Sequence, residues 1–421
     1  MPVPVNVFEH MPETLWPIMI PPESSITFAA VSKHIRGTLC RLQLHAGGGL
    51  DMNICARTTA THAEVPVDGT GASKMKRFTV ALNAYSVFGR ITRLSVRGFS
   101  EHSHLQAHAL YDMQTLADGL NTLPHLTELD VSENAGGFYG VLAIVQALGQ
   151  NPRMRSLNLS KTGLNQLGFI TPTQPYGAIV SHLGNLALVS LNLSGNDMRH
   201  GAGHSLKGLY RMTSLRSLDL SNNQLCFRAN LLPPQPLLWV CDLMRRANIE
   251  TLLLNRNRFG FSGMRDISRA LPLFTSLTEL GVADNRLSVE HMRDLASAVA
   301  AAPHLRVLNL SGNAEHYASM YHFIPSLMDS NISTLVLHRA MIFGISAEML
   351  FKALPLITTL QTLDIQDNNM EDDEPVVLGL ELNTSLRVLN LRGNPVCRSD
   401  RIAAAWVHNQ NAQRALCNLF I

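Results

Sequence analysis

A nine-residue phrase with leucine at positions 1, 4 and 6 and asparagine at position 9 returns throughout this chain. The clearest copy is Leu215, Leu218, Leu220 and Asn223, within "LRSLDLSNNQL". Eleven copies align between Ile91 and Asn394, and most of their ninth positions are 26 to 28 residues apart. A fixed period of this length is typical of a solenoid in which each repeat is one structural unit.

Each repeat predicts a short strand, a turn and a helix. The leucines at positions 4 and 6 have the two-residue period of a strand with one buried face. The asparagine is suited to bond backbone groups where the chain leaves the strand. The following segments have helical periodicity, as in "SVEHMRDLASAVAAAPHL", where Ser288 is a predicted helix cap. Because a single unit cannot bury its own leucines, neighbouring repeats are expected to stack.

The pattern over residues 90–421 resembles the leucine-rich repeat, in the longer form found in ribonuclease inhibitor. The resemblance implies an α/β solenoid, or horseshoe, with parallel strands on the concave face and helices on the convex face. A small helical module is expected before it. The predicted domains are a helical module at 1–44, a linker and N-terminal cap at 45–89, about eleven repeats at 90–396, and a C-terminal helical cap at 397–421. Two proline-rich insertions, 170–177 and 231–239, are predicted to be surface loops.

Residues 11–39 resemble the F-box, a short helical module that docks on the Skp1 adaptor of cullin–RING ubiquitin ligases. The resemblance implies that this segment would hold a Skp1-like adaptor while the repeats select the protein to be ubiquitinated. A simple helical cap for the solenoid is the alternative. The residues that match the family's adaptor-binding pattern are Pro12, Leu15, Ile18, Pro21, Pro22, Ile26, Val31 and Ile35.

In this fold the residues between the strand leucines face the concave surface. They are small and polar in the N-terminal half, whereas apolar residues appear among them in the middle of the chain. An exposed apolar residue with polar neighbours is a candidate anchor for a protein partner. The alternative for any one position is that its residue is merely the default of the repeat. The predicted partner-binding residues are Asp130, Asn158, Asn192, Asp219, Leu253, Asn255, Val307, Val336, His338 and Asp364.

Composition narrows the classes of partner. Lys and Arg number 34 against 32 Asp and Glu, a net charge of +2, which argues against binding nucleic acid or an anionic membrane. The six cysteines form no CxxC pair, as expected of a reducing compartment, cytoplasmic or nuclear. The N-terminus lacks a secretory signal pattern, and no apolar run approaches the ~20 residues of a membrane helix. We expect the chain to be monomeric by itself.

Motifs for catalysis, cofactors and metals are weak. The segment "GTGASK" (69–74) lacks the ending of a phosphate-binding loop, and His102, His104 and His108 have no carboxylate or cysteine to complete a metal site. No enzyme activity, cofactor or metal is therefore predicted. Besides the F-box receptor, two functions stay open. One is a repeat scaffold or regulator without a ligase link, including a bacterial effector acting in a host cell. The other is a GTPase activator. The last would use Arg256 or Arg258 beside Asn257, since Ran GTPase-activating proteins share this repeat class and use an arginine and an asparagine.

Overall fold

The structure is a computed structural model that describes residues 25–28, 40–45, 50–56, 61–64, 92–97, 106–164, 176–199, 209, 211–225, 238–313, 319–408 and 418–421. The chain divides into two compact units. The N-terminal unit comprises Met1–Asp197 and Arg211–Leu215, and the C-terminal unit comprises Met198–Tyr210 and Arg216–Ile421. Each unit is an α/β stack of repeats and is described by itself.

In the C-terminal unit, parallel strands of three residues pair in strict register. Leu252 at the centre of β10 is opposite Leu218 of β9 on one side and Leu280 of β11 on the other, so the leucines at position 4 form a continuous row. From β9 to β15 each of these leucines is buried, whereas the residues before and after it are half-buried in most of the strands. The strands are β9 (Ser217–Asp219), β10 (Thr251–Leu253), β11 (Glu279–Gly281), β12 (Val307–Asn309), β13 (Thr334–Val336), β14 (Thr362–Asp364), β15 (Val388–Asn390) and β16 (Asn418–Phe420).

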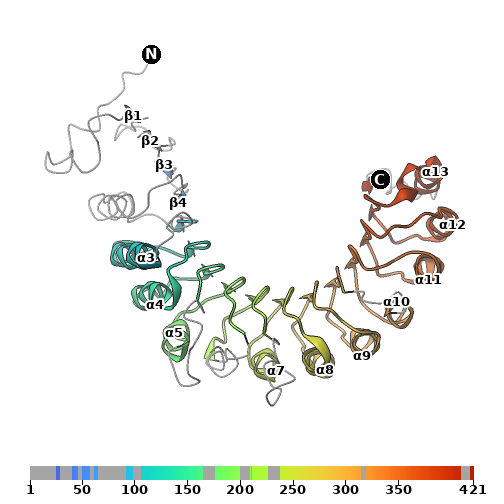
Figure 1. Ribbon diagram of the computed structural model, residues 1–421, viewed down its shortest axis with the longest axis horizontal. Coiled ribbons are helices and arrows are strands. Elements are labelled where there is room, and N and C mark those ends of the chain that lie inside the picture. Colours follow the sequence, from blue (N-terminus) through green and yellow to red (C-terminus); the bar gives the residue numbers. More distant parts are fainter. Residues whose placement is uncertain are drawn as a thin grey trace. The chain divides into compact units, whose positions relative to one another are not determined.

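A helix follows each of these strands up to β15 where the chain is described, and the helices lie along one side of the strand row (Figure 1). Ser288 caps α9 as predicted, because its side chain accepts from the amide of His291. Prolines at the second position of η6, η7 and η8 lie where an α-helix gives way to a 3-10 turn. The helices are α7 (Leu238–Arg246), α8 (Gly260–Ala270), α9 (Val289–Ala300), α10 (Ser319–Phe323), α11 (Ile345–Ala353), α12 (Glu374–Leu382) and α13 (Asp400–His408), with 3-10 turns η6 (Leu271–Leu273), η7 (Ile324–Leu327), η8 (Leu354–Leu356) and η9 (Pro395–Arg398).

The end of the chain differs from the predicted helical cap. Helix α13 buries Ile402 and Trp406, but residues 418–420 form the strand β16, parallel to β15. The register puts Leu419 opposite Leu389. The reason is that "NLF" has the x-Leu-x spacing of the strands before it, so its leucine extends the same row.

The N-terminal unit contains four more parallel strands in the same register. Leu129 of β6 is opposite Leu94 of β5 and Leu157 of β7, so the first predicted copies also form strands. These elements are β5 (Arg93–Ser95), α3 (Gln106–Leu120), β6 (Glu128–Asp130), α4 (Gly137–Leu148), β7 (Ser156–Asn158), α5 (Tyr176–Leu183) and β8 (Ser190–Asn192).

The predicted helical module and linker contain strands instead, and this corrects the prediction. Strands β1 (Ser25–Phe28), β2 (Cys40–His45), β3 (Leu50–Ala56) and β4 (Thr61–Glu64) pair antiparallel in sequence, and β4 joins β5 in parallel. Apolar residues alternate with other residues in "CRLQLH" and "LDMNICA", and the register sets Leu42 opposite Met52. That two-residue period favours strands over the expected loop.

Candidate protein-binding surface

The strand face is defined here by the residues at positions 3, 5 and 7 of each repeat, on either side of the buried leucines. All ten predicted partner-binding residues lie on it, and every one is half-buried. Parallel register aligns them into rows within each unit. In the C-terminal unit, the row at position 5 runs Asp219, Leu253, Gly281, Asn309, Val336, Asp364 and Asn390.

Five of the predicted residues are acidic or amide side chains that shape the end of their own strand. Asn192, for example, accepts a hydrogen bond from the backbone amide of Ser194 at 2.9 Å through Oδ1. This is an Asx turn, in which a short side chain satisfies an amide two residues later. It explains why the repeat favours Asp or Asn at position 5. The five residues are Asp130, Asn158, Asn192, Asp219 and Asp364.

Leu253 and Asn255 extend across the glycine of the next repeat. A Cβ atom built on Gly281 would lie 3.0 Å from both Leu253 Cδ2 and Asn255 Oδ1. Asn255 Oδ1 also accepts from the amide of Ala283 at 2.7 Å, which fixes that side chain between the two repeats. Gly281 therefore leaves room for an apolar side chain to lie along the strand face.

His338, one of the predicted residues, pairs with Asp367, which was not predicted. His338 Nε2 lies 2.8 Å from Asp367 Oδ2, and the guanidinium of Arg339 lies 3.5 Å from the same oxygen. The hydrogen bond from His338, followed by the charges of His338 and Arg339, lowers the pKa of the Asp367 carboxyl. Val307 and Val336 occupy separate strands near this cluster, in positions 3 and 5 of consecutive repeats.

In the N-terminal unit an ion-pair cluster that sequence reasoning missed lies at the edge of the strand face, at positions 7 and 8 of successive repeats. Arg97 donates to Glu133 from Nε and Nη2, both at 3.0 Å, and Lys161 donates to the same carboxylate at 2.9 Å. These bonds, led by that of Arg97, lower the pKa of Glu133 to about 2. The signal is opposite charge at neighbouring positions of successive repeats, which becomes visible only once the copies are aligned.

Beside it, a hollow of about 380 Å³ lies over β5, β6 and β7, lined in part by Arg93, Asp130 and Asn158. Arg93 Nε pairs with Glu128 at 3.0 Å along its wall. The predicted residues Asp130 and Asn158 are thus brought together in one depression. Their neighbour Asn192 lies one strand further along.

The asparagine ladder consists of the ninth-position residues, whose side chains link successive repeats. Asn285 Nδ2 donates to the carbonyls of Leu254 and Val282, and its Oδ1 accepts from the amide of Asn257. The predicted role of this asparagine is confirmed. Asn257 itself is fully buried and engaged in the same way, so it cannot face a substrate, and the GTPase-activator interpretation loses its asparagine. The ladder comprises Asn134 and Asn196 in the N-terminal unit and Asn223, Asn257, Asn285, Asn313, Asn368 and Asn394 in the C-terminal unit.

Of the eight predicted adaptor-binding residues, the structure describes Ile26 alone. Ile26 was expected in a helix, but it lies in β1 opposite Leu44 of β2, which corrects that part of the F-box pattern. The other seven lie outside the described residues: Pro12, Leu15, Ile18, Pro21, Pro22, Val31 and Ile35. Most of the two proline-rich insertions also lies there, with α5 and α7 beginning at Tyr176 and Leu238.

Two further properties concern the described part of the chain alone. Within the ranges given above, every helix is too short or too polar to cross a lipid bilayer. Among the same residues, His, Cys, Asp and Glu side chains nowhere gather in threes in a way that would hold a metal ion.

Two family models for the leucine-rich repeat match short segments, residues 214–237 and 357–373. The leucine-rich-repeat-containing protein LegL7 from Legionella pneumophila has a similar structure, with a TM-score of 0.47 and 21 % identity, covering 72 % of this chain and 89 % of that one. A chain of the yeast Rad7 and Elc1 complex gives a TM-score of 0.44 and 17 % identity, covering 78 % and 85 %. No curated protein matches this chain. The matched repeats, the parallel strands and the alternating helices together establish a leucine-rich-repeat α/β fold.

Proposed function

We propose that this chain is a recognition scaffold that binds another protein on its strand face. Leucine-rich repeats suggest protein–protein interaction in general. The observation that carries the proposal here is Leu253, a half-buried leucine held over Gly281 on a face built mostly from polar side chains. Interfaces are commonly anchored by a few apolar residues within a polar rim.

The surroundings of Leu253 support a macromolecular partner. Asn255, Val307, Val336 and His338 add amide, apolar and imidazole groups on the same strand face. They are spread over the repeats of β10, β12 and β13 instead of converging on one point. A small molecule is usually enclosed by a concave pocket, whereas a protein contacts many separated side chains. We therefore assign the binding energy to the strand face from β10 to β14.

Site-specific photo-crosslinking tests this proposal. A photoreactive phenylalanine derivative replaces Leu253 or Val336 on the strand face, and Leu273 on the helix side serves as the control because it is 57 % exposed. We expect both strand-face positions to crosslink to the same protein in cells and the control position not to do so. Crosslinks from Leu273 alone, or from none of the three, would refute the proposal.

A narrower proposal makes the chain the substrate receptor of a Skp1–cullin–F-box ubiquitin ligase. It rests on the sequence pattern at Pro12, Leu15 and Ile18, since strand β1 removes Ile26 from the helical half of that pattern. A pull-down with a Skp1-like adaptor tests it. If the adaptor retains the original chain but not a variant with charged residues at Pro12 and Leu15, a ligase role is supported. If the adaptor retains both equally, the ligase role is excluded, and the strand-face proposal is unaffected.

A further inference from the structure

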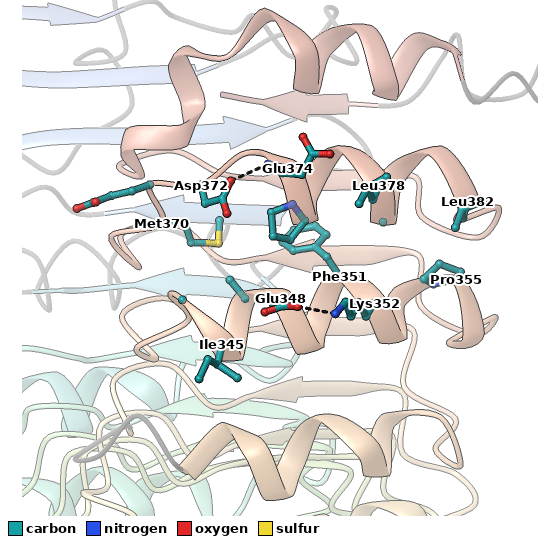
Figure 2. A pocket seen from close by; sticks show the side chains of 15 residues that line it. Ile345, Glu348, Phe351, Lys352, Pro355, Met370, Asp372, Glu374, Leu378 and Leu382 are labelled. Atoms are coloured by element: carbon teal, nitrogen blue, oxygen red, sulfur yellow. Dashed lines mark hydrogen bonds and ion pairs between the residues drawn. The ribbon is translucent and has the colours of Figure 1, made fainter.

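A groove of about 740 Å³ lies between α11 and α12, on the helix side of the C-terminal unit (Figure 2). Its floor is apolar, with Phe351 and Met370 almost completely buried. The two helices meet closely at Gly379, where an added Cβ would lie only 2.6 Å from the carbonyl oxygen of Phe351. This close contact holds the two helices side by side and fixes the groove between them.

The outer edges of the groove are apolar and exposed. Ile345 is 61 %, Leu378 49 % and Leu382 68 % exposed. In Figure 2, Leu378 and Leu382 lie toward one end together with Pro355, and Ile345 lies toward the other. Clustered apolar side chains around a groove mark a binding site more often than isolated exposed ones do.

The lining is also negatively charged. Four carboxylates, those of Glu348, Glu371, Asp372 and Glu374, face a single amine, that of Lys352, among the residues that line the groove. Lys352 pairs with Glu348. The excess negative charge therefore belongs to the 371–374 end, opposite the end with Leu378 and Leu382.

Arg401 of α13 offsets part of this charge. Its guanidinium pairs with Glu374 and, at 2.9 Å, with Asp373. The hydrogen bond to Glu374, followed by the charge of Asp373, raises the pKa of Arg401. Asp372 accepts from the amide of Glu374 at 3.1 Å and keeps its charge exposed at the groove, next to exposed Glu371. The negative charge that Arg401 does not pair with directly is thus concentrated on these two neighbours.

We propose that this groove binds a short amphipathic, basic segment of a partner protein. Its apolar side chains would lie between Ile345, Leu378 and Leu382, and its Lys or Arg residues would lie over Glu371 and Asp372. Helices of nine residues, such as α11 and α12, are about 14 Å long, so two to three helical turns of a partner would fill the groove. The acidic residues also set the orientation of the bound segment, whose basic end would lie beside residues 371–374. This site is independent of the strand face, because it lies on the helix side.

Binding of two synthetic peptides to the full chain tests the proposal. Both are helical, about 14 residues long, with leucines at i, i+3, i+4 and i+7, and they differ only in carrying Lys or Glu at one end. Fluorescence anisotropy measures the Kd. We expect saturable binding of the Lys peptide, weakened by added salt, and binding of the Glu peptide about tenfold weaker.

Variants then locate the site. Leu378→Ser with Leu382→Ser is expected to raise the Kd of the Lys peptide about tenfold, whereas Leu273→Ser, an exposed leucine outside the groove, leaves it unchanged. Glu371→Lys with Asp372→Lys is expected to reverse the preference in favour of the Glu peptide. Unchanged thermal midpoints confirm that the variants fold.

Three results would overturn the proposal. The first is a failure of Lys-peptide binding to saturate. The second is binding of the Lys peptide to the Leu378→Ser, Leu382→Ser variant as tightly as to the original chain. The third is equal affinity of the original chain for the two peptides. Sedimentation that shows a dimer abolished by the same double variant would assign the groove to a second copy of the chain, which also contradicts a basic partner.

Discussion

The backbone amide of Asn257 donates to Oδ1 of Asn285, one repeat later, at 2.8 Å. Both residues are fully buried, and the same bond recurs between Asn285 and Asn313 at 2.7 Å. Side-chain amides in the described ladder thus satisfy backbone groups that the turn would otherwise leave unpaired inside the stack. The repeats are held together by this polar ladder as well as by the row of leucines.

Replacing Asn285 with alanine removes the Oδ1 that accepts from the Asn257 amide and the Nδ2 that donates to the carbonyls of Leu254 and Val282. Because the groups left behind are buried, we expect the free energy of unfolding to fall by about 2–4 kcal/mol. Urea titration followed by circular dichroism measures the change. Asn331→Ala is the control, because Asn331 is exposed and its side chain donates one hydrogen bond, at 3.3 Å, to the Pro303 carbonyl. This substitution should lower the free energy of unfolding by less than about 0.5 kcal/mol. Equal losses in the two variants would contradict a role for the ladder.

Ala340 interrupts the ladder, since its methyl group cannot accept from the amide of Asn313 as the asparagines do elsewhere. Ala340→Asn would restore that acceptor at a position where most other repeats already accommodate an asparagine. We expect the free energy of unfolding to rise by about 1 kcal/mol, seen as a higher denaturant midpoint. A lower midpoint would show that this turn has closed around the smaller residue.

Glu133 makes stability depend on pH in acid. Its carboxyl has a pKa of about 2 in the folded chain against 4.5 for the free group, because Arg97 and Lys161 bind the charged form. The unfolded chain therefore takes up the proton first as the pH falls. The stabilisation is complete above about pH 5 and is lost progressively between pH 4.5 and about 2.

The size of this effect is modest, because the side chains of Arg97 and Lys161 are both 62 % exposed and solvent screens their charges. We expect Glu133→Gln to cost about 1 kcal/mol at neutral pH and low salt, and only a small fraction of that at pH 2. Chemical denaturation at the two pH values compares the variant with the original chain. If Glu133→Gln lowered the free energy of unfolding equally at neutral pH and at pH 2, Glu133 would act through packing instead of charge.

Gly379 and Gly177 form a matched pair of helical glycines. An alanine at Gly379 would bring a methyl group against the Phe351 carbonyl, so we expect Gly379→Ala to lower the free energy of unfolding by about 1–3 kcal/mol. Gly177 in α5 has open space around it, and Gly177→Ala should raise the free energy of unfolding by about 0.5–1 kcal/mol through helix propensity. Thermal or urea unfolding of the two variants measures both changes in the free energy of unfolding. The same sign of change in both variants would contradict the close approach of α11 and α12.

The repeat period was enough to predict the strands from β5 to β15, because leucines that cannot be buried alone force the units to stack. It also predicted the half-exposed position of Leu253 and Val336, since a two-residue period assigns each side chain to a face. Strands β1 to β4 and β16 were missed because their sequences lack the asparagine of the template. The groove at Gly379 was missed for a different reason: it is formed by two helices of neighbouring repeats, and spacing within one repeat does not show how closely helices approach.

The affinity of the crosslinked partner for strand-face variants tests the central claim most directly. Once the partner is isolated, its Kd is measured by calorimetry for the original chain, for Leu253→Glu with Val336→Glu, and for Leu273→Glu on the helix side. We predict that the strand-face variant binds about 30- to 100-fold more weakly, as expected when interface anchors are removed, while the helix-side variant binds like the original. Undiminished binding by the strand-face variant, with a folded protein, would contradict the account.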